Sequence, residues 1–335
     1  MAGGFGHADA NRVSSDTTPL NEIAMDIITD RETTNSVTVR PFLKWAGGKS
    51  QILEPIRERY PQGLGTTVPK YAEPFVGGGA VLFDVLSRFD VPDVYISDVN
   101  RELVATYLAV RDSAAELIAL LKGLASEYLP ADDAARKVMY YANRERFNSL
   151  KLAKSESVEL AALFIFLNRT CFNGLYRVNA KGAFNVPQGA YKNPTICDEG
   201  NLLAVSKKLQ NVTIVCADFK QSASFIDGDT FAYFDPPYRP LTETANFASY
   251  AEDGFTDDDQ RVLAAFIDEM SDRGAYIVTS NSDPKNADPD DDFFDRLYSG
   301  YEIARITATR AINSVALSRG KITELLICNR EKRER

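Results

Sequence analysis

The sequence predicts an α/β fold with a doubly wound, mostly parallel sheet of seven strands, because apolar runs alternate with helical patterns along the chain. Apolar runs with strand character lie at Tyr71–Phe75, Val94–Ser97, Val212–Cys216, Thr230–Phe234, Ala275–Ser280, Tyr301–Thr307 and Ile322–Cys328. Helical patterns lie at Glu102–Leu121, Asp257–Met270 and Asp292–Leu297. Because ligands bind beyond the carboxyl ends of the strands in such sheets, we expect the acidic residues at those ends to converge on one cleft. These residues are Glu73, Asp98, Asp218 and Asp235.

The chain divides into three regions by sequence character. Residues 1–38 are rich in Thr, Ser, Asp and Asn and predict a disordered or loosely attached extension. Residues 39–98 and 212–330 carry the seven strand patterns and are predicted to form the sheet domain. Residues 99–211, between the second and third strands, are dominated by helical patterns and end in a Gly-, Asn- and Pro-rich segment. This insert is long enough to form a helical subdomain on the sheet.

The composition narrows the class of protein and its chemistry. No apolar run approaches the roughly 18 residues that span a membrane, and the amino terminus lacks a signal-peptide pattern, so we expect a cytoplasmic protein. With His7 as the only histidine, Ser-His-Asp hydrolysis and histidine–metal catalysis are nearly excluded. The cysteines stand singly, so they predict neither disulfides nor a zinc site, and we expect no metal. They are Cys171, Cys197, Cys216 and Cys328.

The charge of the chain is unevenly distributed. The net charge of −9 counts against nucleic-acid binding when it is taken alone. Residues 161–192, however, contain four Lys or Arg residues and no Asp or Glu, whereas acidic residues concentrate at 257–259 and 288–292. A basic region on an acidic body is compatible with binding a polyanion on one face.

A Gly-rich turn from Glu73 to Gly79 follows the first strand and leads into a helical run, Ala80–Leu86. Glycines let the backbone approach a ligand closely at a helix amino terminus. Asp98 ends the next strand, where an acidic residue commonly accepts hydrogen bonds from ribose hydroxyls. Together these features predict a ribose-containing cofactor, and a nicotinamide cofactor fits them as well as any other.

The segment Phe234-Asp-Pro-Pro-Tyr238 directly follows the hydrophobic fourth strand. The Asp235 carboxylate and a proline-fixed carbonyl can both accept hydrogen bonds from one amino group. The adjacent Tyr238 offers a face on which a planar base can stack. A strand-ending turn is the structural alternative, since Asp-Pro-Pro is good turn chemistry. Combined with the Gly-rich turn and Asp98, the segment favours a catalytic pocket.

Five blocks of sequence resemble, in order, those of the Dam-type adenine methyltransferases, the D12 class. They are Phe42-Leu-Lys-Trp-Ala-Gly-Gly-Lys49; Glu73-Pro-Phe-Val-Gly-Gly-Gly79; Asn168-Arg-Thr-Cys-Phe-Asn-Gly-Leu-Tyr-Arg177; Phe184-Asn-Val-Pro-Gln-Gly189; and Asp235-Pro-Pro-Tyr238 followed by Thr244-Ala-Asn-Phe247. The resemblance runs from Pro41 to about Asn329 and leaves the first 38 residues unmatched. It implies a seven-stranded methyltransferase sheet whose insert, residues 99–211, recognises DNA.

The resemblance also assigns a cofactor site and a catalytic pocket. It implies that S-adenosylmethionine is the cofactor and that it contacts Trp45, Lys49, Glu73, Phe75, Gly77, Gly79, Asp98, Asp218 and Phe219. It implies that the target adenine enters a pocket formed by Asp235, Pro236, Pro237 and Tyr238. Methyl transfer to the adenine amino group is then direct and needs neither a covalent enzyme intermediate nor a metal.

Duplex DNA is the partner that the resemblance implies. The implied DNA-binding residues are Lys44, Arg169, Phe172, Asn173, Leu175, Arg177, Asn185, Pro187, Arg310 and Asn313. Arg177 belongs to a hairpin that enters the major groove, where Arg reads guanine bidentately, and Lys44 contacts a base near the flipped adenine. The hairpin resembles that of members that methylate GATC, which is therefore the expected target. Ala190 departs from the pattern, because some members carry a basic residue there.

Several alternatives stay open on the sequence alone. A nicotinamide-dependent oxidoreductase would explain the Gly-rich turn and Asp98 but not the Asp-Pro-Pro-Tyr segment. A non-catalytic DNA-binding regulator would keep the hairpin without the chemistry. Within the methyltransferases, Asp rather than Ser before Pro-Pro-Tyr favours adenine over cytosine, and the deep, narrow major groove of duplex RNA disfavours RNA. We expect a monomer, with a cognate restriction endonuclease as a possible partner.

Overall fold

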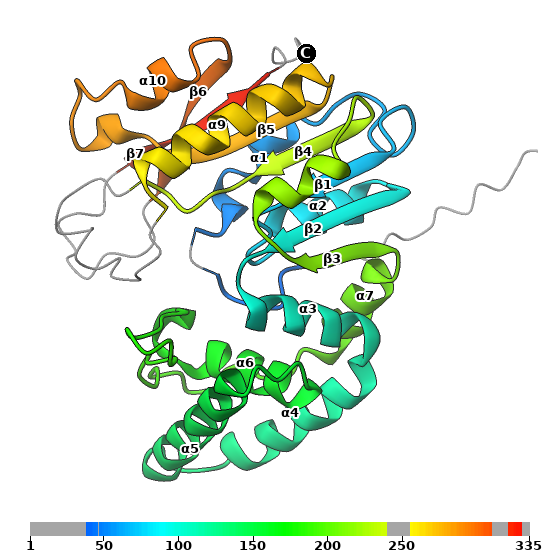
Figure 1. Cartoon of the computed structure of the whole chain (residues 1–335). Helices are drawn as coiled ribbons and strands as arrows, with labels where there is room; N and C mark the ends of the chain where they lie inside the picture. Colours follow the sequence, from blue (N-terminus) through cyan, green and yellow to red (C-terminus); the bar gives the residue numbers. More distant parts are fainter. Residues whose placement is uncertain (1–37, 46, 240–254, 310–320, 330–335) are drawn as a thin grey trace, which may run out of the picture. The chain divides into compact units, whose positions relative to one another are not determined.

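Seven strands form one sheet in the computed structural model of the chain, which describes residues 38–45, 47–239, 255–309 and 321–329 (Figure 1). The strands are β1 Lys70–Glu73, β2 Asp93–Asp98, β3 Val212–Cys216, β4 Thr230–Phe234, β5 Tyr276–Ser282, β6 Glu302–Thr309 and β7 Lys321–Cys328. They lie in the order β3-β2-β1-β4-β5-β7-β6. All seven predicted strands are therefore present, with boundaries that differ by at most two residues.

The sheet is mixed rather than parallel throughout. Strands β1 to β5 pair in parallel, whereas β7 runs antiparallel to both β5 and β6. The expectation of a mostly parallel sheet holds for the first five strands, and the carboxyl-terminal hairpin departs from it. Every residue of β4 is buried, as expected for a central parallel strand covered on both faces.

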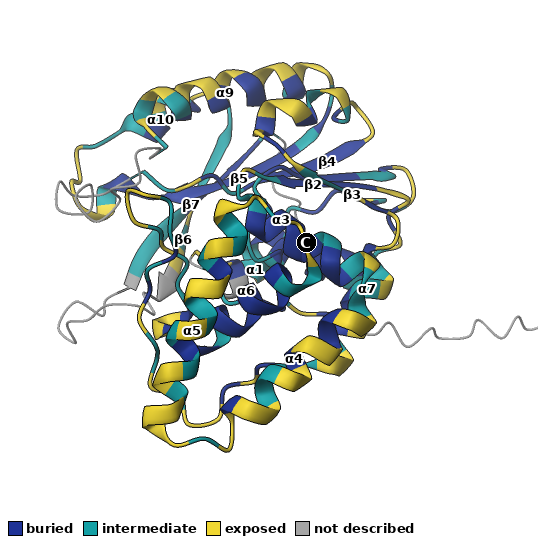
Figure 2. Ribbon diagram, turned by 60° about the horizontal axis from the view of Figure 1, so that its bottom comes forward, coloured by how far each residue is buried: buried dark blue, intermediate teal, exposed yellow. Residues whose placement is uncertain are grey.

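Two hydrophobic layers cover the faces of the sheet (Figure 2). Side chains alternate between the layers along each strand, so that Tyr71 belongs to one layer and Ala72 to the other. In β4, Phe231 and Tyr233 likewise face one layer, while Phe234 faces the second. The first layer is formed with α1 Leu53–Arg57, α2 Ala80–Arg88, α3 Arg101–Asp112 and α7 Glu199–Leu209. The second is formed with α9 Asp257–Asp272 and α10 Phe293–Leu297.

The helices between β2 and β3 continue the first hydrophobic layer away from the sheet. Helix α3 packs on β2, β3 and α7, and it also contacts α6. The remaining helices are α4 Ala114–Tyr128, α5 Asp133–Leu152 and α6 Val158–Thr170. Helix α6 contacts α3, α4 and α5 and has ten buried residues, so it forms the centre of this helical group (Figure 1).

The segment Glu102–Leu121, predicted as one helical pattern, belongs to two helices, α3 and α4. The expectation of a single helix was therefore wrong. Ser113 has φ −138° and ψ 35°, outside the helical region, and separates α3 from α4. Several helices begin after a residue whose side chain caps the helix amino terminus. Asn100 caps α3, Ser157 caps α6, and Thr256 forms a capping box with Asp259 at the start of α9.

Candidate active site and DNA interface

The candidate site lies at the point in the sheet where the order of the strands reverses, between β1 and β4. Strand β1 pairs with β2 on one side and β4 on the other, and ligands in such sheets bind beyond the carboxyl ends of the strands at this point. The predicted acidic residues all stand at this edge of four adjacent strands. Glu73 ends β1, Asp98 ends β2, Asp218 follows β3 by two residues, and Asp235 follows β4 directly.

The Gly-rich turn after β1 is held in place by Asp98. Gly77 has φ +47°, and its N–H donates to Oδ2 of Asp98 at 3.1 Å, while the N–H of Asn100 donates to Oδ1 at 2.8 Å. Burial raises the pKa of Asp98, and these backbone donors oppose the rise. Gly79 has φ +71° and caps α2. The 3₁₀ turn η1 Lys49–Gln51 contacts α2.

Trp45 covers the same turn. A Cβ added to Gly77 would lie 2.9 Å from Cδ1 of Trp45, so the indole packs directly on the glycine backbone. The indole also contacts Tyr176, whose ring stacks on it at 5.8 Å between centroids, and the edge of Phe164 at 6.3 Å. Tyr176 belongs to the segment between β2 and β3, so Trp45 connects the Gly-rich turn to the predicted DNA-recognition region.

Glu73 is a buried carboxyl at the centre of the site. It is 2 % exposed and accepts a hydrogen bond from the hydroxyl of Tyr71 at 2.6 Å. Burial raises the pKa of Glu73 to about 8; the Tyr71 hydrogen bond opposes this rise, and the nearby Asp235 charge adds to it. Glu73 is therefore mostly protonated at neutral pH, and a bound cation would favour its ionised form.

Phe75 and Phe219 form an aromatic pair next to the acidic edge. Their rings stack with centroids 5.5 Å apart, and Phe219 begins the 3₁₀ turn η3 Phe219–Ser224. Asp218 caps this turn by accepting from the N–H of Lys220 at 3.0 Å. Buried Phe219, partly buried Phe75 and the Asp218 carboxylate thus lie next to one another.

The catalytic segment begins with a salt bridge. Nζ of Lys49 lies 2.8 Å from Oδ1 of Asp235 and donates to the carbonyl of Gly47 at 2.6 Å. The Lys49 side chain is 4 % exposed and also lies over the Tyr238 ring, 4.6 Å from its centroid. Burial raises the pKa of Asp235, and the Lys49 ammonium opposes this by favouring the carboxylate. The predicted cofactor residue Lys49 therefore contacts two residues of the predicted catalytic pocket.

Three residues that the sequence reasoning missed hold this segment. The hydroxyl of Ser280 lies 2.8 Å from Oδ1 of Asp235, and the hydroxyl of Tyr238 donates to Glu324 at 2.7 Å. The Gln260 side chain donates to the carbonyl of Pro237 at 3.2 Å. Ser280 could have been predicted as a site residue, because it belongs to a polar run at the carboxyl end of β5. Neither Gln260 nor Glu324 lies in such a motif.

The predicted DNA-reading residues form an irregular hairpin. Val178 and Phe184 form an antiparallel bridge, and the N–H of Asn185 donates to the carbonyl of Arg177 at 3.1 Å. Nε of Arg177 donates to Oδ1 of Asn185 at 2.8 Å, so these two predicted DNA-binding side chains are in contact. Arg177 itself is exposed. The charged end of the hairpin is therefore pre-oriented by its partner strand.

A second pair of segments extends the hairpin toward the sheet. The N–H of Phe172 donates to the carbonyl of Pro187 at 2.9 Å, and the Phe172 side chain is 51 % exposed. Asn173 adopts φ +55° and is exposed, while Leu175 is partly buried against the core. An exposed aromatic side chain beside a basic hairpin suits contact with bases.

Lys44 lies against this hairpin. The N–H of Lys44 donates to Asn168 at 2.8 Å, and Asn168 in turn donates to the carbonyls of Lys44 and Gly174. Gly174 adopts φ +64°, and a Cβ there would lie 2.6 Å from the Lys44 side chain. The ammonium of Lys44 lies 4.1 Å from the centroid of the Tyr191 ring. Lys44 is thus brought to the same surface as the hairpin.

Arg169 differs from the other predicted DNA-binding residues. Its guanidinium donates to the carbonyl of Phe42 at 2.8 Å, and burial lowers its pKa. This internal contact accounts for Arg169 without DNA, so its predicted role in DNA binding stays a prediction. Arg310, Asn313 and the block 244–247 lie outside the described residues, as does the predicted extension apart from Thr38.

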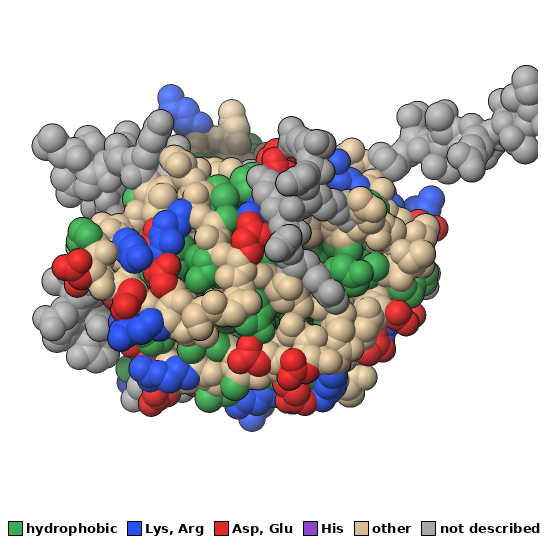
Figure 3. Space-filling model, turned by 90° about the horizontal axis from the view of Figure 1, so that it is seen from above, with side chains coloured by type: hydrophobic (Ala, Val, Ile, Leu, Met, Phe, Trp, Pro, Cys, Tyr) green, Lys and Arg blue, Asp and Glu red, His purple; other side chains and the backbone are tan. Residues whose placement is uncertain are grey.

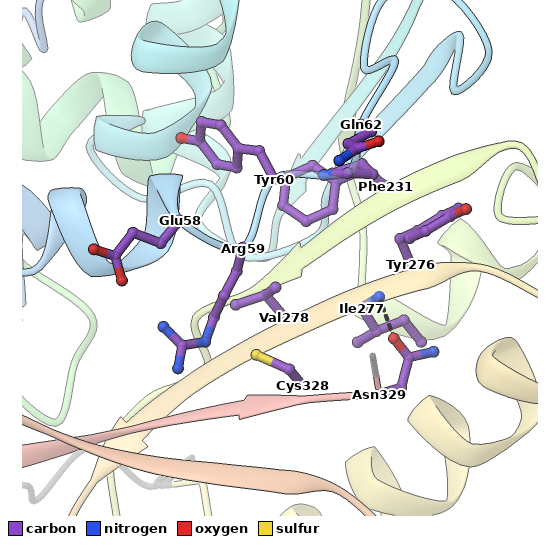
Figure 4. A pocket seen from close by; sticks show the side chains of 11 residues that line it. Glu58, Arg59, Tyr60, Gln62, Phe231, Tyr276, Ile277, Val278, Cys328 and Asn329 are labelled. Atoms are coloured by element: carbon purple, nitrogen blue, oxygen red, sulfur yellow. Dashed lines mark hydrogen bonds between the residues drawn. The ribbon is translucent and has the colours of Figure 1, made fainter. Parts of the chain in front are cut away.

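The structure also has a cavity away from this site. This cavity of about 380 Å³ lies at the amino-terminal ends of the parallel strands, where β4 and β5 begin (Figure 4). It is lined by Glu58, Arg59, Tyr60, Pro61, Gln62, Phe231, Tyr276, Ile277, Val278, Cys328 and Asn329. In the view of Figure 3, acidic and basic side chains are interspersed, so the visible face carries no field of a single sign.

Comparison with known proteins identifies the family. Residues 45–312 match the family model described as D12 class N6 adenine-specific DNA methyltransferase. The chain belongs to this family. It is 49% identical over 293 residues to the type II methyltransferase M.MjaIII of Methanocaldococcus jannaschii. The aligned region covers 87% of this chain and 99% of that protein.

Other relatives of this D12-class methyltransferase have matching lengths. The type II methyltransferase M1.LlaDCHI of Lactococcus lactis is 36% identical over 297 residues, covering 88% of this chain and 97% of the relative. The DNA adenine methylase of Escherichia coli is 33% identical over 287 residues, covering 86% of this chain and 94% of the relative. The protein is therefore an adenine-specific DNA methyltransferase, and this result overturns the oxidoreductase and the non-catalytic regulator as alternatives.

The family implies S-adenosylmethionine as the cosubstrate. Within the described ranges, the helices are too short or too polar to cross a membrane. The same part of the chain contains no group of three His, Cys, Asp or Glu side chains arranged to hold a metal ion.

Proposed function

We propose that this methyltransferase transfers a methyl group from S-adenosylmethionine to the exocyclic amino group of adenine within GATC in duplex DNA. The observation that carries the catalytic assignment is the position of Asp235, Pro236 and Tyr238 directly after buried strand β4. The target adenine rotates out of the base stack to reach this pocket. Tyr238 stacks on the base, while the Asp235 carboxylate and the Pro236 carbonyl accept hydrogen bonds from its amino group.

The pocket acts by holding the amino nitrogen and stabilising charge on it. Nitrogen becomes more positive as its bond to the methyl carbon forms, and the adjacent Asp235 carboxylate favours that charge. The amino group must then lose one proton, which Asp235 holds in a hydrogen bond until the proton passes to water. Pro236 and Pro237 restrict the backbone, so that carboxylate and carbonyl keep one relative orientation.

The residues at the acidic edge fit S-adenosylmethionine, which supplies a methyl group on a positively charged sulfonium. Three backbone N–H groups, those of Gly77, Val99 and Asn100, act on the Asp98 carboxylate, which has about four lone-pair sites, so acceptor capacity remains for a ribose hydroxyl. Phe75 and Phe219 offer an aromatic face beside Asp218 for an adenine ring. Buried Glu73, whose pKa is raised, suits a ligand that brings positive charge.

The hairpin provides sequence recognition in this proposal. Arg177 reads a guanine edge in the major groove, and its contact with Asn185 limits the orientations that its guanidinium can adopt. Phe172 and Pro187 lie beside it and supply apolar contacts. Lys44 contacts a base near the flipped adenine. The further contacts proposed from the family pattern are those of Asn173, Leu175, Arg310 and Asn313.

The names of the relatives support adenine as the methylated base and bear on the biological context. Several relatives are DNA adenine methylases, and two are type II methyltransferases. The type II relatives support a restriction–modification context, with a cognate endonuclease, as the proposed setting. GATC is proposed from the resemblance of the hairpin that contains Arg177, not from the names of the relatives. A monomer suffices, because a single adenine is modified in each event.

Methyl transfer to two duplexes tests this proposal. One duplex contains a single GATC and the other contains the same bases scrambled, and both are incubated with radiolabelled S-adenosylmethionine. We expect label only in the first, which also becomes protected from a methylation-sensitive GATC nuclease. Label in both duplexes would refute GATC while keeping the enzyme class. Label in neither, with the cofactor shown to bind, would refute GATC and require a search for another target.

A further inference from the structure

Ser280 is a buried hydroxyl residue in contact with the catalytic segment. It lies near the carboxyl end of β5 and is completely buried. Its Oγ lies 2.8 Å from Oδ1 of Asp235 and 2.9 Å from the hydroxyl of Tyr233, which is also completely buried. The three groups form a chain of hydrogen bonds that starts inside the sheet and ends at the Asp235 carboxylate.

The direction of each hydrogen bond in this chain follows from the number of protons. An ionised Asp235 can only accept, so the single proton of the Ser280 hydroxyl is donated to Oδ1 at 2.8 Å rather than to the more distant Phe234 carbonyl at 3.5 Å. Ser280 must then accept from Tyr233, whose hydroxyl therefore donates to Oγ. Burial raises the pKa of Tyr233 well above its usual value, which keeps this phenol protonated and a donor. The chain thus has one polarity, from Tyr233 through Ser280 to Asp235.

The two oxygens of the Asp235 carboxylate have different partners. Oδ1 receives both the Ser280 hydroxyl and the Lys49 ammonium, each at 2.8 Å. Among the described residues, none donates a hydrogen bond to Oδ2 of Asp235. The Asp235 side chain is 21% exposed. Within the described part of the chain, the protein therefore occupies one oxygen of the carboxylate and places no donor on the other.

We propose that Ser280, oriented by Tyr233, is a positioning residue for catalysis. It fixes Oδ1 of Asp235 so that Oδ2 accepts the hydrogen bond from the target amino group. This inference rests on the proposed role of Asp235 as the acceptor of that amino group. A carboxylate held by Lys49 alone would keep its charge but could rotate about its Cβ–Cγ bond, because an ammonium imposes little directional preference.

The effect of removing this hydroxyl is large enough to measure. A hydrogen bond to a charged group corresponds to a change of about 10- to 100-fold in rate when it is lost from the transition state. The same loss removes stabilisation of the carboxylate, which raises the pH at which Asp235 ionises by about one unit. The charged and titratable groups around Asp235 are Lys49, Glu73, Tyr233 and Tyr238, and the substitution of Ser280 leaves all four in place.

The test compares Ser280→Ala, Ser280→Thr and Tyr233→Phe in the full-length enzyme. Thr279→Val is the matched control, because Thr279 is the buried neighbour in β5 and its hydroxyl has no hydrogen-bond partner in the described part of the chain. For each variant, kcat, KM for a GATC duplex, the Kd for S-adenosylmethionine and the melting temperature are measured. The dependence of kcat on pH is then recorded.

We expect Ser280→Ala to lower kcat about 10- to 100-fold and to shift the acidic limb of the kcat profile upward by about one pH unit. The Kd for S-adenosylmethionine and the KM for DNA should change less than about threefold, since ground-state binding is retained. Ser280→Thr should retain most of kcat, and Thr279→Val should leave it unchanged. Tyr233→Phe removes a hydrogen bond between neutral groups and should lower kcat by about 3- to 10-fold, less than Ser280→Ala.

A kcat for Ser280→Ala within about twofold of the wild type would overturn the inference. If that variant does not fold, Tyr233→Phe decides by the same criterion, because the ring is retained. Asp235→Ala separates this inference from the proposed function. An inactive Asp235→Ala with a normal Ser280→Ala would refute only the role of Ser280, whereas an active Asp235→Ala would refute the pocket itself.

Discussion

The ammonium of Lys49 lies 2.8 Å from Oδ1 of Asp235, and this pair joins the turn before α1 to the segment after β4. Lys49 is almost completely buried, so the pair is shielded from water and salt on the lysine side. The ammonium also lies over the ring of Tyr238. Lys49 thus contacts the two side chains proposed to hold the target adenine, in addition to its predicted place at the cofactor site.

The substitution Lys49→Met should impair catalysis through Asp235. It removes the positive charge that opposes the burial-induced rise in the Asp235 pKa, so the carboxyl will be protonated over a wider pH range. We expect kcat at pH 7 to fall by about tenfold or more and its acidic limb to move to higher pH. Lys70→Met is the control, since it breaks a 2.7 Å pair with Asp227 at the other edge of the sheet. Equal losses in both variants would contradict a specific role for Lys49.

The affinity for S-adenosylmethionine should rise with pH because of Glu73. The pKa of Glu73 is about 8, so below that pH the carboxyl is mostly protonated in the free protein. Binding of a cation favours the carboxylate, and a proton is released. Raising the pH from about 6 to about 7.5 therefore lowers the cost of that release, and Kd should fall by up to about tenfold per pH unit.

Calorimetry in buffers with different ionisation enthalpies measures this proton release directly. Glu73→Gln is the control, because glutamine can accept the Tyr71 hydrogen bond but does not titrate. Its affinity should be independent of pH over the same range. Proton release by Glu73→Gln equal to that of the wild type would exclude Glu73 as the source.

Substitution of Arg177 should change sequence discrimination rather than general DNA affinity. A bidentate contact between Arg and guanine is worth about 1–3 kcal/mol of discrimination, so Arg177→Ala should reduce the preference for GATC over a one-base variant by about 5- to 150-fold. Lys181→Ala is the control, because Lys181 is an exposed cation of the same hairpin. It should weaken binding to both duplexes alike. If Lys181→Ala relaxes discrimination as strongly as Arg177→Ala, the assignment of base reading to Arg177 is wrong.

Substitution of Arg169 distinguishes a structural role from DNA contact. Its guanidinium is largely buried against the carbonyl of Phe42, and loss of that hydrogen bond should destabilise the fold by about 1–3 kcal/mol. We expect Arg169→Met to lower the free energy of unfolding but to leave the salt dependence of DNA binding unchanged. A shallower dependence of log K on log salt, by about one, would instead show a lost phosphate contact.

The strands were predictable because each carries its own local signal. Strand β4 is a continuous apolar run followed by Asp-Pro-Pro, and both its bounds and its central position follow from that pattern. The division between α3 and α4 was not predictable in this way. The apolar spacing continues across Ser113, and only the non-helical backbone of that residue separates the helices.

The sequence predicted the motif residues of the site better than their supports. Asp98 and Asp235 stand at strand ends, and the rule for parallel sheets brings them to one edge. The partners of the pocket come from distant elements. Glu324 lies on β7, which pairs antiparallel to β5, and Gln260 lies on α9. Such contacts depend on strand order and helix packing, which short motifs do not encode.

Single-turnover methyl transfer by wild-type and Asp235→Ala enzyme on a GATC duplex tests the central claim most directly. At saturating S-adenosylmethionine, we expect the Asp235→Ala rate to fall by about a hundredfold or more, since the acceptor of the target amino group is lost. The Kd for the cofactor should stay within about threefold of the wild type. A near-normal rate of methyl transfer by Asp235→Ala would contradict the proposed pocket.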